Sequence, residues 1–129
     1  MTTHRIGYIG LGSLGSAIFP NLVNYARDQN LPAPSVWNRS PEKYAPLKEV
    51  SSEIYMAEQP GELVSRCNVI FTCLVNDQAV EEVYGKLVRA LQDKGDKGEK
   101  IVFADQTTLK VGTACKSIGP AMRLRWFSR

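Results

Sequence analysis

Three glycines near the start of the chain, Gly10, Gly12 and Gly15, limit the folds open to this sequence. Apolar residues in segment 6–9 predict a buried strand directly before them, and apolar residues at helical spacing follow. A strand that enters Gly-x-Gly-x-x-Gly and continues as a helix is typical of a turn that binds a dinucleotide. The first glycine permits the bend, the second lets the backbone approach a pyrophosphate, and the third lets the helix pack against the sheet.

The backbone of this loop supplies the predicted phosphate contacts. N–H groups at the start of a helix have no partner within the helix, and they lie at the positive end of its dipole. The alternative is a glycine-rich turn that holds no ligand, which the flanking strand and helix disfavour. The predicted pyrophosphate-binding residues are Gly10, Leu11, Gly12, Ser13, Leu14 and Gly15.

The rest of the chain alternates predicted strands and helices. Strands are expected at 35–37, 54–56, 68–75 and 101–105, with helical segments between them. This alternation predicts an α/β fold, a doubly wound parallel sheet in a single domain. Pro20 falls inside the first predicted helix, where it removes one hydrogen bond and should kink or shorten the helix.

The end of the second predicted strand indicates which dinucleotide binds. An NAD-binding domain carries an acidic residue there, which holds the ribose 2′-hydroxyl. This chain has Asn38, Arg39 and Ser40 instead. A carboxylate would repel a 2′-phosphate, whereas the planar guanidinium of Arg39 suits bidentate contacts to one. We therefore expect NADP rather than NAD, the alternative being an arginine that merely ends an ordinary strand.

Composition argues against several other functions. The net charge of +3 is too small to indicate a nucleic-acid partner, and no apolar run reaches the length of about 20 residues that spans a membrane. Three cysteines, an odd number, suggest reduced thiols and a cytoplasmic location. The single histidine, His4, precedes the first strand, so neither a metal site nor a Ser/His/Asp triad is expected.

Four motifs, occurring in this order, resemble the β-hydroxyacid dehydrogenases, which include 3-hydroxyisobutyrate dehydrogenase and 6-phosphogluconate dehydrogenase. They lie at 7–15, 37–40, 68–74 and 105–108, and the resemblance covers about residues 4–115. It implies a Rossmann domain that binds NAD(P) in an oxidoreductase. Such an enzyme transfers a hydride between the nicotinamide and a small hydroxy acid or semialdehyde.

The resemblance also implies roles for individual residues. Asn38, Arg39 and Ser40 match the 2′-phosphate pocket of NADP-using members. The loop under the nicotinamide-side ribose is matched by Leu74, Val75 and Asn76, although the family usually has proline in place of Val75. Thr107 matches a residue that holds the substrate carboxylate, and Thr108 a threonine beside the nicotinamide.

The sequence departs from the family after residue 115. Members continue into a helical domain that carries a catalytic lysine, and neither Lys110 nor Lys116 matches its position. We therefore expect an NAD(P)-binding domain at 1–115, a divergent and truncated basic tail at 116–129, and no catalytic residue in this chain.

These departures leave the function with alternatives. The chain is expected to be the NADP-binding domain of an oxidoreductase, nearly inactive by itself, that exposes an apolar face and can self-associate. The alternative is a non-catalytic NADP-binding sensor or interaction module. A nucleic-acid-binding protein that uses the basic tail is a third and more remote possibility.

Overall fold

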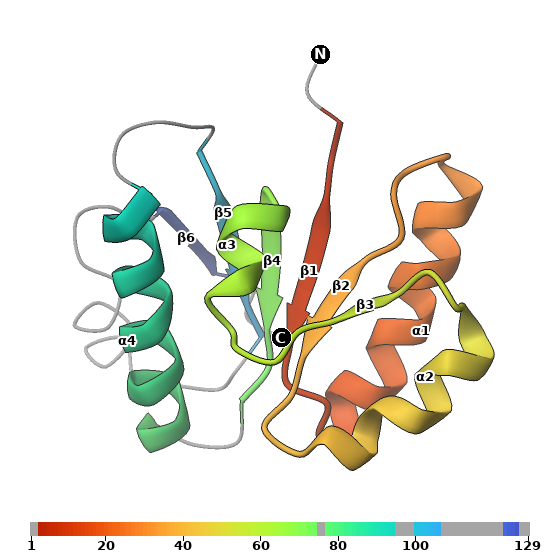
Figure 1. Ribbon diagram of the computed structural model, residues 1–129, viewed down its shortest axis with the longest axis horizontal. Helices are drawn as coiled ribbons and strands as arrows, with labels where there is room; N and C mark the ends of the chain where they lie inside the picture. The colour runs from red at the N-terminus through yellow and green to blue at the C-terminus, as the bar shows by residue number, and fades with distance from the viewer. Residues whose placement is uncertain (1–2, 75–76, 95–99, 107–122, 127–129) are drawn as a thin grey trace.

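One parallel sheet forms the centre of the fold (Figure 1). The computed structural model describes residues 3–74, 77–94, 100–106 and 123–126. Six strands run through these residues: β1 (Ile6–Ile9), β2 (Ser35–Trp37), β3 (Tyr55–Met56), β4 (Val69–Thr72), β5 (Val102–Asp105) and β6 (Arg123–Trp126). The helical elements are α1 (Ser13–Asp28), the 3-10 helix η1 (Pro41–Tyr44), α2 (Ala45–Val50), α3 (Glu62–Arg66) and α4 (Asp77–Lys94).

The strand order β3-β2-β1-β4-β5-β6 is that of a Rossmann fold. The chain starts at the centre of the sheet, proceeds outward to β3, and then crosses back to β4 on the other side of β1. At such a reversal, the loops that leave the two central strands diverge and open a crevice at the carboxyl edge of the sheet. The predicted α/β class and parallel sheet are confirmed, and the glycine loop after β1 lies at this edge.

Helices cover both faces of the sheet. Neighbouring residues of a strand point to opposite faces, and the fully buried Tyr8 and Ile9 accordingly belong to different core clusters. Tyr8 packs in the cluster that contains Phe19 of α1 and Leu47 of α2. Ile9 packs in the cluster that contains residues of α3 and α4, such as Leu87. The sheet is therefore doubly wound.

Part of the segment that the sequence separates as a basic tail belongs to the sheet. Residues 123–126 form β6, which runs parallel to β5 with Val102 opposite Arg123 and Asp105 opposite Trp126. No strand is expected there from the basic character of the segment. The alternation of arginine with Leu124 and Trp126 is nevertheless the period-two pattern of a strand, and charged residues are common on edge strands.

Candidate functional site

The first glycine of the loop is required by the fold. Gly10 has a φ of +104°, which residues with a side chain rarely adopt, and a Cβ there would lie 2.0 Å from the carbonyl oxygen of Cys73. Its own N–H donates to the carbonyl of Trp37 at 3.0 Å. Gly10 is therefore held between the ends of β2 and β4, and the close approach leaves room only for glycine. Leu74, another predicted site residue, lies beside it, with Cδ2 3.5 Å from the same Cβ position.

The other two glycines differ from each other. A Cβ on Gly15 would lie 1.9 Å from the carbonyl oxygen of Gly10, so Gly15 lets α1 pack closely against the loop. A Cβ on Gly12 would meet no atom of the described residues within 4 Å, and Gly12 has an ordinary φ of −70°. Protein packing therefore does not demand a glycine at position 12. The open space in front of its backbone fits a pyrophosphate that approaches the start of α1.

Asn38 fixes the loop to the end of β2. Its Oδ1 accepts the N–H of Leu11 at 2.8 Å, and its Nδ2 donates to the carbonyl of Ser40 at 3.0 Å. The side chain of Leu11 is buried in the core, and Ser16 Oγ donates to the Leu11 carbonyl at 2.8 Å. Asn38 and Leu11 thus hold the loop in place from its protein-facing side. The exposed Ser13 and the half-buried Leu14 begin α1.

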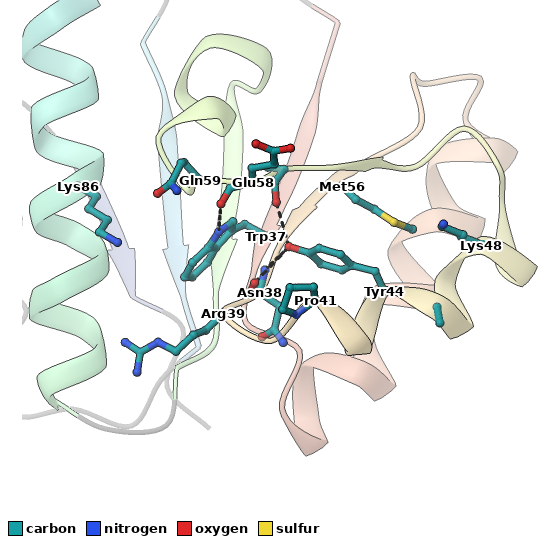
Figure 2. Close-up of a pocket in the computed structure, with 12 residues that line it drawn as sticks. Trp37, Asn38, Arg39, Pro41, Tyr44, Lys48, Met56, Glu58, Gln59 and Lys86 are labelled. Atoms are coloured by element: carbon teal, nitrogen blue, oxygen red, sulfur yellow. Dashed lines mark hydrogen bonds between the residues drawn. The ribbon is translucent and has the colours of Figure 1, made fainter.

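A pocket of about 710 Å³ lies beyond the carboxyl end of β2 (Figure 2). It extends from the loop after β2 across η1 to α4, from which Lys86 reaches it. Three cationic side chains and one carboxylate line it, so its charge favours an anionic ligand. The lining residues are Trp37, Asn38, Arg39, Pro41, Tyr44, Ala45, Lys48, Met56, Ala57, Glu58, Gln59 and Lys86.

Hydrogen bonds brace two aromatic walls of this pocket. Nε1 of Trp37 donates to the carbonyl of Glu58 at 3.2 Å. The Tyr44 hydroxyl accepts the N–H of Asn38 at 2.8 Å and lies 3.0 Å from the carbonyl oxygen of Ala57. Burial raises the pKa of Tyr44, so its phenol stays neutral and can donate. The two rings therefore hold the ends of β2 and β3 in one arrangement.

Arg39 extends from the loop after β2 toward α4 (Figure 2). Its guanidinium forms an ion pair with the carboxylate of Glu82, a residue of α4. The two side chains are 67% and 52% exposed. The cation that the sequence assigns to a phosphate thus has a protein carboxylate as its partner.

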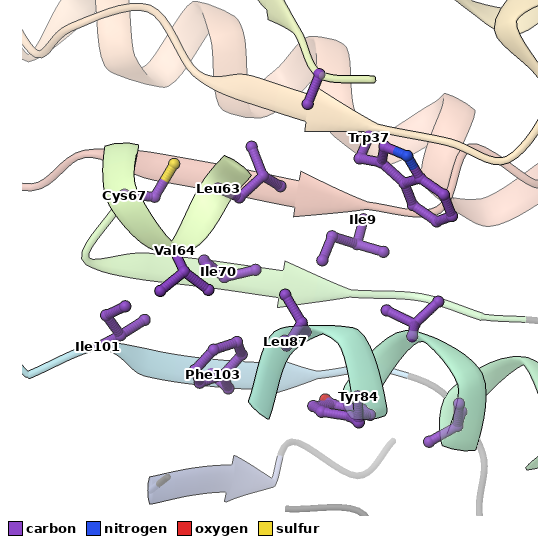
Figure 3. Close-up of a cluster of buried hydrophobic side chains, with 13 residues drawn as sticks. Ile9, Trp37, Leu63, Val64, Cys67, Ile70, Tyr84, Leu87, Ile101 and Phe103 are labelled. Carbon is purple, nitrogen blue, oxygen red and sulfur yellow. The ribbon is translucent and has the colours of Figure 1, made fainter. Parts of the chain in front are cut away.

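A second polar group lies at the carboxyl ends of β4 and β5. The Tyr84 hydroxyl of α4 lies 2.9 Å from Thr72 Oγ1 and donates to Asp105 Oδ2 at 3.2 Å. All three side chains are buried, and the Tyr84 ring belongs to the core cluster under α4 (Figure 3). Burial, and secondarily the Asp105 carboxylate, raise the pKa of Tyr84. Nearby, Tyr8 donates to Gln106 Oε1 at 2.8 Å.

The structure brings together the predicted residues that it describes. The glycine loop, Asn38, Arg39, Ser40 and Leu74 lie at the carboxyl ends of β1, β2 and β4. The predicted Val75, Asn76, Thr107 and Thr108 lie outside the described residues. Within the described ranges, no group of three metal-binding side chains is placed to hold an ion. No helix in these ranges is long and apolar enough to cross a membrane.

Sequence reasoning missed several pocket residues. Lys48 reaches the site from α2, shortly after the second strand, whereas Lys86 and Glu82 reach it from α4, far along the chain. No local motif marks them, because only the folded arrangement brings these helices to the end of β2. Tyr44 could have been noticed as an aromatic residue shortly after the Asn-Arg-Ser segment.

Comparisons with known proteins agree with this arrangement. The family described as the NAD binding domain of 6-phosphogluconate dehydrogenase matches residues 5–118. Among solved structures, an oxidoreductase from Mycobacterium avium shares 23% identity at a TM-score of 0.70, over 89% of this chain and 36% of its own. A reductive aminase from Aspergillus terreus in complex with NADPH4 shares 21% identity at a TM-score of 0.66, over 97% of this chain and 40% of its own.

Curated sequence relatives include the N-PAC proteins of several animals. The cytokine-like nuclear factor N-PAC of Xenopus tropicalis is 32% identical over 82 residues, which is 64% of this chain and 14% of that protein. N-PAC of Drosophila melanogaster is 30% identical over 114 residues, which is 85% of this chain and 18% of that protein. The chain therefore spans less than a fifth of the length of these two relatives.

Proposed function

Because the chain belongs to the family of the NAD-binding domain of 6-phosphogluconate dehydrogenase, we propose that it binds NADP(H) across the carboxyl edge of its sheet. Gly12 is the observation that carries this proposal. Gly10 and Gly15 are needed for packing, whereas in the part of the chain that the structure describes no atom lies within 4 Å of a Cβ placed on Gly12. A glycine that the fold does not require, at the start of a helix, supports a role in admitting the pyrophosphate.

The surroundings of the pocket support NADP over NAD. Arg39, Lys48 and Lys86 line it, and the residue at the end of β2 is Asn38 rather than an acid. Asn38 uses its amide to hold the loop, so we assign the 2′-phosphate to Arg39, with Ser40 beside it. The attraction between these cations and a bound phosphate is strongest at low ionic strength, because salt screens it.

The reaction that we propose for a complete enzyme of this kind is oxidation or reduction of a small hydroxy acid or semialdehyde. The bound cofactor would donate or accept a hydride, and this chain would bind and orient it. Thr107 and Thr108 are our candidates for contacts to substrate and nicotinamide. Because the sequence has no lysine at the position of the family's acid/base, we expect little or no dehydrogenase activity from the 129 residues alone.

A second candidate function is a non-catalytic NADP-binding module. The similarity to proteins named as nuclear factors, at 30–32% identity, favours this alternative. Self-association through an apolar face stays a prediction. Among the described residues, the large hydrophobic side chains with exposed surface are Tyr25 and Val102.

An NADPH titration, monitored by tryptophan fluorescence, tests the proposal. Trp37 lines the pocket, so bound cofactor should quench its emission. We expect saturable quenching by NADPH, with affinity weakened at least about tenfold, or about 1.4 kcal/mol, for NADH and for Arg39→Ala.

The second tryptophan, Trp126, requires a control. Trp37→Phe should remove most of the cofactor-dependent change, and calorimetry should then still detect binding. If neither NADPH nor NADH binds to a folded chain by either method, the proposed function is wrong.

A further inference from the structure

The ion pair between Arg39 and Glu82 has a consequence for cofactor choice. Arg39 lines the pocket from the end of β2, and its ion-pair partner Glu82 belongs to α4. Lys86, one helical turn after Glu82, also lines the pocket. Helix α4 therefore brings both a carboxylate and an ammonium group to the edge of the site.

A 2′-phosphate and the Glu82 carboxylate would compete for the Arg39 guanidinium. Each accepts hydrogen bonds from a guanidinium in a bidentate manner. A phosphate monoester carries between about 1.5 and 2 negative charges at neutral pH, more than the single charge of a carboxylate. The pair is also exposed, so it is weak and can be opened by a stronger anion.

We propose that Glu82 determines how strongly this site prefers NADP over NAD, by occupying Arg39 until a 2′-phosphate displaces it. This inference rests on the proposed function and adds a specificity-determining residue to it. NADP must open the ion pair, and the released carboxylate then repels the phosphate to the extent that salt, with a screening length of about 8 Å at physiological ionic strength, leaves the two charges unscreened. NAD has no phosphate at this position, so its binding neither opens the ion pair nor suffers repulsion from the released carboxylate.

The test compares NADPH and NADH binding by wild type, Glu82→Gln and Glu81→Gln. At low ionic strength, Glu82→Gln should bind NADPH about three- to fivefold more tightly than wild type and NADH within about twofold of wild type. Rising salt should reduce this gain. Glu81→Gln removes the same charge from the neighbouring exposed position of α4, and it should leave the NADPH-to-NADH affinity ratio unchanged.

A double variant tests whether Glu82 acts through Arg39. In the Arg39→Gln background, adding Glu82→Gln should improve NADPH binding less than it does in wild type. Both side chains are exposed, so thermal unfolding should confirm that every variant is folded.

The outcomes separate this inference from the proposed function. If wild type binds NADPH but Glu82→Gln has no effect, the inference is wrong. It is also wrong if Glu81→Gln gives an equal gain, or if the gain persists in full without Arg39. If no variant binds either dinucleotide, the proposed function fails, and this inference fails with it.

Discussion

Single residues of the glycine loop perform separable tasks. Gly10 and Gly15 have neighbours that a Cβ would approach within 2.0 Å and 1.9 Å, whereas Gly12 has none within 4 Å among the residues that the structure describes. The first two therefore serve the fold, and we assign the third to the ligand.

Paired substitutions at the residue scale test this division. Gly10→Ala should lower the free energy of unfolding by more than about 2 kcal/mol, because it combines a positive φ with a steric clash. Gly12→Ala should cost about 1 kcal/mol or less, the preference for glycine over alanine at an N-cap, yet weaken NADPH binding by about tenfold or more. Urea unfolding and cofactor titration measure the two effects. Unimpaired binding by Gly12→Ala would contradict the assignment.

The sequence motif predicts a separate role for each of the three glycines, and the contacts of Gly10 and Gly15 agree with two of these roles. Their spacing predicts the strand, turn and helix correctly, because φ and close packing at such turns are general requirements. The contact of Gly10 with the Cys73 backbone is not visible in the sequence, because Cys73 lies more than sixty residues further along the chain, whereas Gly15 meets the nearby carbonyl of Gly10. The ion pair of Arg39 with Glu82 was hidden for the same reason, since helix α4 approaches β2 only in the folded chain.

Helix α1 shows how an element tolerates an unfavourable residue. Pro20 lies within it, and the helix nevertheless continues to Asp28. The expected shortening does not occur, because Phe19 and Val23 are buried against the sheet on either side of the proline. Tertiary packing thus outweighs the lost hydrogen bond, which residue 20 would have made to the carbonyl of Ser16.

Replacing this proline should stabilise the protein. Pro20→Ala restores a backbone donor in the helix interior, which is worth more than the entropy that proline removes from the unfolded chain. We expect a gain of about 1–2 kcal/mol in the free energy of unfolding. Pro46→Ala is the matched control, because Pro46 lies in the first turn of α2 and displaces no helical hydrogen bond. Equal effects at both sites, measured by urea unfolding, would contradict this explanation.

Other elements differ in how well the sequence predicts them. Strand β2 has the predicted bounds, since turn residues flank three buried residues. The predicted strand 68–75 is longer than β4, because Cys73 and Leu74 already turn toward the glycine loop. Ser40 precedes a 3-10 helix and makes no side-chain capping bond. The short η1 instead brings Tyr44 to the backbone of Asn38.

At the scale of the whole molecule, a buried polar group connects α4 to the sheet. The Tyr84 hydroxyl is hydrogen-bonded to both Thr72 and Asp105 at the carboxyl ends of β4 and β5. The raised pKa of Tyr84 means that the folded state holds the neutral phenol. The unfolded chain ionises it near its ordinary pKa of about 10. Its contribution to stability is therefore complete below about pH 10 and is lost as the pH rises further.

Alkaline unfolding tests this connection. The free energy of unfolding of wild type should fall as the pH rises above about 10, and Tyr84→Phe should show a shallower fall. At pH 7, Tyr84→Phe should cost about 1–3 kcal/mol, because it removes a hydroxyl that Asp105 and Thr72 both use. Parallel pH profiles for wild type and variant, measured by urea unfolding, would show that Tyr84 does not supply this dependence.

The position of β1 at the middle of the sheet also affects how the protein is made. Strand β1 is made before the other strands of this sheet, and it pairs with β2, which ends at Trp37, and with β4, which ends at Thr72. Until β4 has emerged, one edge of β1 is open, and its backbone groups are available to another chain. A stalled or cleaved product that ends between these two strands therefore carries the phosphate loop without the Cys73 backbone that packs against Gly10.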